Sequence, residues 1–127
     1  MIGIREAGID DCLAFVGGKA WMRRYVVAMQ QRGEAYLIVD HDDPLALAFL
    51  IPRDDGLREF CLGIDPRARV HMRELCRSAQ LILKRLAQDG AIVCNVMPGN
   101  RSGARMARIV GFEPDPEDPI LWTMGAL

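Results

Sequence analysis

The stretch from residue 57 to residue 97 constrains the fold more than any other part of the chain. Residues 57–64 form an apolar extended run that Asp65-Pro66 ends, and residues 91–97 form a second apolar run. Between them, residues 70–88 carry apolar side chains at helical spacing and predict one long amphipathic helix. A long helix between two strands leaves no room for a hairpin, so it predicts a right-handed crossover that joins parallel strands. The residues expected on the buried face of this helix are Leu75, Ala79, Ile82, Leu83 and Leu86.

The chain before this crossover predicts a strand at residues 2–5 and then two helices. Asp10-Asp11 provides the N-cap of the first helix, and Gly17-Gly18 ends it. The second helix spans residues 20–31, and Gly33 stops it. The apolar residues at helical spacing are Leu13, Phe15 and Val16 in the first helix and Trp21, Tyr25, Val26 and Met29 in the second.

Three strands follow, at residues 35–40, 45–51 and 57–64, and polar turns at 41–44 and 53–56 connect them. Short turns between successive strands imply an antiparallel meander. These three strands and the parallel crossover therefore predict one mixed sheet, most of which is antiparallel.

The segment 93–112 predicts a strand, a turn and a helix in close succession. Asn100 is expected to cap this helix and Gly111 to end it. Met106, Ile109 and Val110 form one apolar face of the helix. An acidic, proline-rich loop at 114–119 and a terminal strand at 120–124 complete the order β-α-α-β-β-β-α-β-α-β.

Composition limits the classes of function. A chain of 127 residues is expected to form one domain, and its net charge of −1 argues against nucleic acid or an anionic membrane as a partner. No apolar run approaches the length of a membrane span, and the polar start does not look like a signal peptide. Four scattered cysteines without a C-x-x-C pair indicate a reducing, cytoplasmic location. No histidine has metal-ligand neighbours, so no metal site is expected.

The string VCNVMPGNRSGARMARIVGF, residues 93–112, resembles the carboxyl-terminal signature of the GNAT superfamily of acyl-CoA N-acyltransferases. With the order of elements, the resemblance covers essentially the whole chain. It implies a single α/β (α+β) GNAT-like domain over residues 1–127 that uses acetyl-CoA as co-substrate. The acceptor would be a small-molecule amine or a protein amine, which attacks the thioester directly in a ternary complex.

The resemblance also implies where acetyl-CoA would bind. The pantetheine arm would lie beside the strand that ends at Gly63 and Ile64, and the pyrophosphate at the start of the long helix. Both glycine positions of the family's pyrophosphate loop carry other residues here, Met72 and Glu74. Ala107 stands where the family often has the tyrosine that protonates the leaving thiolate. The residues expected to contact acetyl-CoA are Gly63, Ile64, Arg69, Val70, His71, Met72, Arg73, Asn100 and Arg105.

Glu59 is the candidate catalytic residue, because some members of the family place a carboxylate on this strand to take a proton from the amine. The simpler interpretation is that Glu59 is the solvent-facing residue of an alternating strand. For Cys61 and Cys94, packing in the core is favoured over a role as nucleophile. Residues 21–25 line an acceptor pocket or, in the simpler interpretation, contribute to the core.

Two functions therefore remain open. The first is N-acetyltransfer to an unknown amine. The second is a catalytically silent binding or assembly protein, since small phage-encoded proteins of this fold with altered glycine loops look similar. The apolar residues 120–127 would supply an edge strand for a homodimer.

Overall fold

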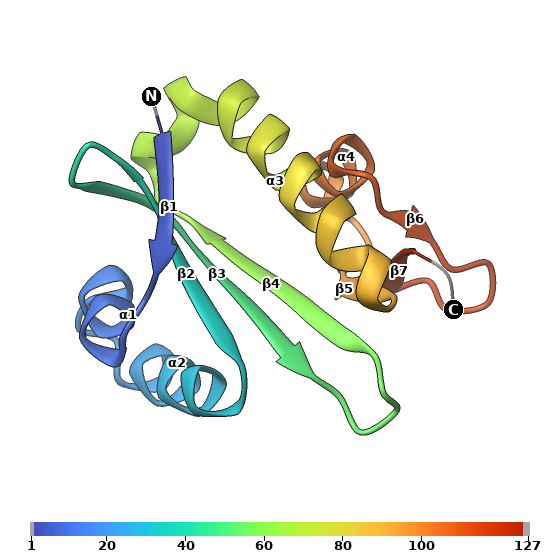
Figure 1. The fold of residues 1–127 in the computed structure, drawn as a ribbon, viewed down its shortest axis with the longest axis horizontal. Coiled ribbons are helices and arrows are strands. Elements are labelled where there is room, and N and C mark those ends of the chain that lie inside the picture. Colours follow the sequence, from blue (N-terminus) through green and yellow to red (C-terminus); the bar gives the residue numbers. More distant parts are fainter. Residues whose placement is uncertain (1, 126–127) are drawn as a thin grey trace. The chain divides into compact units, whose positions relative to one another are not determined.

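The computed structural model describes residues 2–125, which form seven strands, four α-helices and two short 3-10 helices (Figure 1). The strands are β1 (Ile2–Glu6), β2 (Glu34–Asp40), β3 (Asp43–Pro52), β4 (Arg58–Ile64), β5 (Ile92–Asn95), β6 (Glu113–Pro114) and β7 (Leu121–Met124). The α-helices are α1 (Ile9–Val16), α2 (Ala20–Arg32), α3 (Met72–Leu86) and α4 (Arg101–Val110). The 3-10 helices are η1 (Pro66–His71) and η2 (Ala87–Asp89), one on each side of α3.

The strands follow the hydrogen-bonded order β1-β2-β3-β4-β5-β7-β6. Strands β4 and β5 are parallel, whereas the pairs β1–β2, β2–β3, β5–β7 and β6–β7 are antiparallel. This confirms the mixed, mostly antiparallel sheet and the crossover through α3. Strand β7 lies between β5 and β6. The prediction that residues 120–127 supply a sheet edge is therefore wrong for β7, and residues 126 and 127 lie outside the described part of the chain.

The chain forms two compact units, which divide strand β4 between them. The first unit runs up to Pro52 and includes Cys61–Val70. The second consists of Arg53–Phe60 and the residues from His71 onward.

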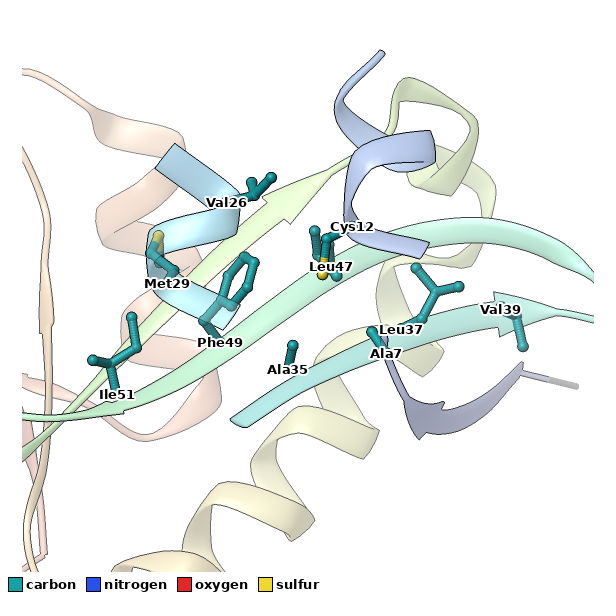
Figure 2. Close-up of a cluster of buried hydrophobic side chains, with 10 residues drawn as sticks. All are labelled: Ala7, Cys12, Val26, Met29, Ala35, Leu37, Val39, Leu47, Phe49 and Ile51. Atoms are coloured by element: carbon teal, nitrogen blue, oxygen red, sulfur yellow. The ribbon is translucent and has the colours of Figure 1, made fainter. Parts of the chain in front are cut away.

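The first unit has its core between the two N-terminal helices and strands β2 and β3 (Figure 2). Alternate residues of each strand point into this cluster, as the two-residue repeat of a strand requires. Leu47 and Cys12 are essentially inaccessible to solvent. The cluster consists of Ala7, Cys12, Val26, Met29, Ala35, Leu37, Val39, Leu47, Phe49 and Ile51.

Helix α1 begins one residue earlier than the carboxylates that were expected to cap it. Its N-cap is Gly8, and the Asp11 carboxylate accepts the Gly8 N–H at 3.1 Å. Asp11 also forms an ion pair with Arg5 at 3.1 Å, and these contacts hold the pKa of Asp11 below its ordinary value. The predicted capping role of Asp10-Asp11 is therefore wrong in position, because Asp11 acts from the first turn of the helix.

The second unit is built around β5, where Ile92 and Val93 are fully buried and α3 packs beside α4. Arg58 ties the end of α3 to β4, because its Nη2 donates to the carbonyls of Leu86 at 2.5 Å and Gly90 at 2.6 Å. The rings of Phe60 and Phe112 stack with centroids 6.2 Å apart.

The helix faces of the second unit differ in part from the sequence-based expectation. Helix α3 begins at Met72, after η1, instead of at residue 70. Leu75 and Leu83 are buried as expected, but Ile82 is exposed. In α4 the buried residues are Ala107 and Val110, while Ile109 is 51% exposed. The segment expected as a loop at 114–119 begins within the short strand β6.

Among the described residues, no helix is both long enough and apolar enough to cross a lipid bilayer.

Candidate functional site

Strand β4 carries the candidate base and the first candidate cofactor contacts. Its parallel ladder with β5 consists of two residue pairs, Arg58 with Ile92 and Glu59 with Val93. Strand β4 then continues to Ile64, five residues beyond Glu59. The main chain of β4 thus extends well past its last parallel pair.

The Glu59 carboxylate forms an ion pair with Arg53, with 3.7 Å between Oε1 and Nη1. About a quarter of the Glu59 side chain is exposed, so the residue is neither fully solvated nor buried. The tight turn after β3 sets this contact, because the Arg53 N–H donates to the Leu57 carbonyl at 2.7 Å. Arg53 also pairs with Asp55 at 3.1 Å. The simpler interpretation, in which Glu59 only faces solvent, did not include this ion pair with Arg53. The position of the two residues on either side of one hairpin turn could have indicated the contact.

Cys94 in β5 is a buried thiol close enough to Glu59 for its charge to matter. Burial raises the pKa of Cys94 to about 12, and the negative charge of Glu59 acts in the same direction. Because only the thiolate is a strong nucleophile, this cysteine is inert near neutral pH. Cys61 is half-buried and packs against the core of the first unit. Core packing therefore accounts for both cysteines.

The chain leaves β4 through Asp65, whose interactions are local to the first unit. The Asp65 N–H donates to the Leu45 carbonyl at 2.9 Å, at the residue where β3 bulges. The Asp65 carboxylate accepts the Arg67 N–H at 2.9 Å and the Arg67 Nε at 3.1 Å. These bonds lower the pKa of Asp65. Gly63 and Ile64, just before this turn, are both exposed.

The predicted pyrophosphate turn was expected to offer free backbone amides at the start of a helix. The structure has a 3-10 helix there instead. Helix η1 precedes α3 without a break, and a 3-10 helix bonds its amides to carbonyls three residues earlier. At its first turn, the Ala68 N–H donates to the Asp65 carbonyl at 2.9 Å. An anion at residues 69–74 would therefore depend on side chains more than on amides.

The side chains available there include two exposed cations, Arg69 in the first unit and Arg73 in the second. Val70 is 84% exposed, and His71, the N-cap of α3, makes no side-chain capping bond. Met72 and Glu74, which occupy the glycine positions, are both half-buried. Each unit thus presents one exposed arginine in this segment, Arg69 in the first and Arg73 in the second.

The corner between β5 and α4 confirms the predicted helix boundaries. The Asn100 side chain accepts the Gly103 N–H at 2.9 Å and so caps α4. Gly111 ends the helix with φ near +121°, and its N–H donates to the Ala107 carbonyl at 3.1 Å. Arg105 is exposed on the outer face. Ala107, at the position where the family often has a tyrosine, is buried, and an alanine has no hydroxyl group.

Three further side chains, all in the first unit, are largely exposed. His41 is 88% exposed in the turn between β2 and β3. Trp21 and Tyr25 are 65% and 57% exposed on α2, so they are not core residues. Within residues 2–125, no three His, Cys, Asp or Glu side chains converge as metal ligands.

No protein-family model matches the chain, and no curated protein matches it. Solved structures do match, among them the acetyltransferases that follow. A Bacillus subtilis acetyltransferase in complex with CoA is similar with a TM-score of 0.73 and 10% identity, over 100% of both chains. The aminoglycoside acetyltransferase AAC(6')-Ib, in complex with coenzyme A and kanamycin, gives 0.72 and 14%, over 98% of this chain and 95% of that one.

The ribosomal-protein-S18-alanine N-acetyltransferase from Escherichia coli is similar with a TM-score of 0.71 and 12% identity. This match covers 100% of this chain and 96% of the other. The predicted GNAT-like fold is therefore confirmed over the length of the chain.

Proposed function

We propose that this protein is an acetyl-CoA-dependent N-acetyltransferase. The observation that carries the proposal is its similarity, over nearly its entire length, to acetyltransferases whose structures include coenzyme A. One fold can host several functions, so the proposal also rests on the residues at the expected site. We further propose that residues 1–127 act as one catalytic domain in the cytoplasm, where four free cysteines suit a reducing environment.

The reaction joins the acetyl carbonyl carbon to an amine nitrogen. The neutral amine attacks the thioester, the new C–N bond forms, the C–S bond breaks, and CoA leaves as a thiolate that then takes up a proton. The amine loses its proton to a base or to water. The similar structures act on, or bind, a protein alanine in one case and kanamycin in another, so a protein amine and a small-molecule amine both remain suitable acceptors.

We assign binding of the CoA phosphates to Arg69 and Arg73, because guanidinium groups bind phosphate in a bidentate manner. The other proposed contacts are Gly63, Ile64, Val70, His71, Met72, Asn100 and Arg105.

Calorimetric titration with acetyl-CoA, with free CoA in parallel, tests the assignment. Micromolar affinity is expected, about −8 kcal/mol. Arg69→Ala and Arg73→Ala should each weaken binding about 10-fold, since each removes a charge-assisted hydrogen bond. Arg85→Ala, an exposed arginine in the last turn of α3, is the matched control.

Unchanged affinity in both Arg69→Ala and Arg73→Ala would disprove this phosphate site. Absence of binding to the wild-type protein would disprove the proposed co-substrate itself.

We propose Glu59 as the group that accepts the amine proton, directly or through water. Glu59→Gln keeps the shape of the side chain but removes its basicity. Once an acceptor amine is found by screening, this variant should lose about 10²-fold or more in kcat, the usual contribution of a general base, while acetyl-CoA binds with unchanged affinity. A kcat within 2-fold of the wild type would leave Glu59 with its structural role beside Arg53 only.

A catalytically silent binding or assembly protein is the second candidate. Two observations favour it: buried Ala107 has no proton to donate, and 3-10 turns precede the start of α3. Replacing Met72 and Glu74 by glycine restores the family's loop composition. If the wild type does not bind acetyl-CoA and this double variant does, the protein descends from an enzyme whose loop has been lost. Binding by the wild type would instead favour the enzyme.

A further inference from the structure

The outer faces of α3 and α4 in the second unit are rich in positive charge. Of the twelve exposed residues on these two helices, seven are cations and none is acidic. The seven cations, called here the basic face, are Arg73, Arg77, Lys84, Arg85, Arg101, Arg105 and Arg108. Glu74 is the single carboxylate in either helix, and it is half-buried.

The cations form one stripe on each helix. In α3 Arg73, Arg77 and Lys84 recur at spacings of four and seven residues, which places them opposite buried Leu75. Arg85 directly follows Lys84. In α4 Arg101, Arg105 and Arg108 recur at four and three residues, opposite buried Val110. Since α3 and α4 pack against each other, the stripes belong to neighbouring helices of the same unit (Figure 1).

This arrangement is unfavourable for the isolated protein. Like charges one helical turn apart repel each other by about 0.2–0.5 kcal/mol per pair, and a carboxylate at such a position would instead attract. The sequence has 17 acidic residues, four of which lie between Glu113 and Asp118. The net charge of −1 is therefore the sum of regions with opposite charge. It does not describe the electrostatic potential at the surface of α3 and α4, which is positive.

We infer that the basic face binds the phosphate backbone of a nucleic acid duplex. A clustered set of arginine and lysine side chains along a helix face is the electrostatic footprint of such binding. Six of the seven cations are arginines, whose planar guanidinium suits phosphate oxygens. From Arg73 to Arg85 the exposed stripe of α3 covers twelve residue steps, about 18 Å at 1.5 Å per step, which is long enough to follow several phosphates.

Other polyanionic surfaces fit less well. Helices that bind a membrane surface insert Trp, Phe or Leu into it, and the exposed positions of α3 and α4 hold no aromatic residue and only three aliphatic ones, Leu81, Ile82 and Ile109. The absence of an aromatic platform on these two fully described helices also disfavours single strands, which bind by base stacking. The core of a protein interface would need more apolar surface.

The experiment measures fluorescence anisotropy of a labelled 20-base-pair RNA duplex and a DNA duplex of the same sequence, with the full chain, at 50 and 200 mM KCl. The wild type should bind at 50 mM and lose about 100-fold in affinity at 200 mM if about four phosphates are neutralised. The triple variant Arg77→Gln, Lys84→Gln, Arg85→Gln should bind at least 10-fold more weakly. Its salt slope should be smaller by about 3, because three counterion-releasing contacts are lost.

The triple variant Lys19→Gln, Arg24→Gln, Arg32→Gln is the matched control, since it removes the same charges from exposed positions on or beside α2. It should stay within 2-fold of the wild type. None of the substituted residues belongs to the proposed acetyl-CoA contacts, so both triple variants should bind acetyl-CoA as the wild type does. Failure of the proposed enzyme activity would therefore leave this test intact.

Three results would overturn the inference. The first is no binding to either duplex at 50 mM KCl. The second is an equal loss in the two triple variants, which would reduce the effect to net charge. The third is tighter binding to oligo-dT or to vesicles of three parts phosphatidylcholine and one part phosphatidylglycerol than to the duplexes.

Discussion

At the scale of single residues, the N-terminus of α4 depends on two side chains that must be considered together. The Asn100 side chain caps the helix by accepting the Gly103 N–H. A Cβ added at Gly103 would lie only 2.4 Å from Nδ2 of Asn100. The glycine is thus required by the cap and not by the helix, where alanine would otherwise be preferred by about 1 kcal/mol.

Gly103→Ala and Asn100→Ala should therefore not be additive. Asn100→Ala should cost about 1 kcal/mol, the usual value of an N-cap. Gly103→Ala should bring no gain in the wild type, because it displaces the cap, but should stabilise the Asn100→Ala variant by about 1 kcal/mol. Urea unfolding of the four proteins measures this cycle. Equal effects of Gly103→Ala in both backgrounds would contradict the proposed conflict.

Cys94 should make stability depend on pH in the alkaline range. Its pKa is raised from 9.0 to about 12 by burial, so the folded protein keeps a proton that the unfolded chain releases. The stabilisation is fully present below pH 9 and is lost as pH rises toward 12. Over this range the contribution to the free energy of unfolding falls by up to about 1.4 kcal/mol per pH unit.

Comparison with Cys94→Ala isolates this contribution from other groups that titrate above pH 9. Urea unfolding at pH 8 and pH 10 should show a difference between the two pH values that is about 1 kcal/mol larger for the wild type. Parallel pH dependence in the two proteins would show that the folded protein releases the Cys94 proton as readily as the unfolded one.

At the scale of elements, the end of α2 depends on the close approach of Gly33 to β3. A Cβ at Gly33 would lie 2.4 Å from the Leu50 carbonyl oxygen and 2.9 Å from the Ile51 Cα. Both atoms belong to the main chain of a strand in which these residues are buried, so neither can move freely. Steric contact explains this glycine, because its φ of −149° is accessible to any residue.

Gly33→Ala should destabilise the protein by about 2 kcal/mol or more, in the range of overpacked core substitutions. Gly18→Ala is the matched control, because a Cβ there meets no atom within 4 Å. It should be neutral or stabilise by up to about 1 kcal/mol through the unfolded state. Thermal unfolding of both variants provides the measurement, and equal melting temperatures would contradict the contact.

The elements themselves were largely predictable, because local chemistry marks their ends. Asn100 and Gly111 bound α4 as expected, and the strands agree with the alternating apolar runs within a few residues. The start of α3 was not predictable in the same way. It follows η1, whose first turn is stabilised by Asp65, and Asp65 is itself held by the Leu45 carbonyl twenty residues earlier in the chain.

At the scale of the whole molecule, burial divides apolar residues of the same type into two energetic classes. Leu47 is 2% exposed within the core of the first unit, whereas Leu81 is 66% exposed on α3. Leu47→Ala should cost about 2–5 kcal/mol, and Leu81→Ala should stay within about 0.5 kcal/mol of the wild type. Guanidinium unfolding of the two variants tests this, and a comparable loss in both would mean that Leu81 is buried in solution.

The candidate site shows the same division between sequence and structure. The resemblance to GNAT enzymes could be read from residues 93–112, and the similar solved structures confirm the fold that it implied. The sequence also showed that Met72, Glu74 and Ala107 depart from the family. It did not reveal the ion pair of Glu59 with Arg53, nor the hydrogen bond that the Arg67 N–H donates to the Asp65 carboxylate.

The sequence by itself determined the order of the elements apart from β6 and the two 3-10 helices, the parallel crossover and the helix boundaries in α4. These follow from steric limits, hydrogen-bond capping and apolar periodicity, which act over a few neighbouring residues. Only the tertiary structure decided that Ile82, Ile109, Trp21 and Tyr25 are exposed, and that Cys94 is a thiol with a strongly raised pKa. Burial and ion pairing depend on contacts between residues distant in the chain, and helical or strand periodicity alone does not specify those contacts.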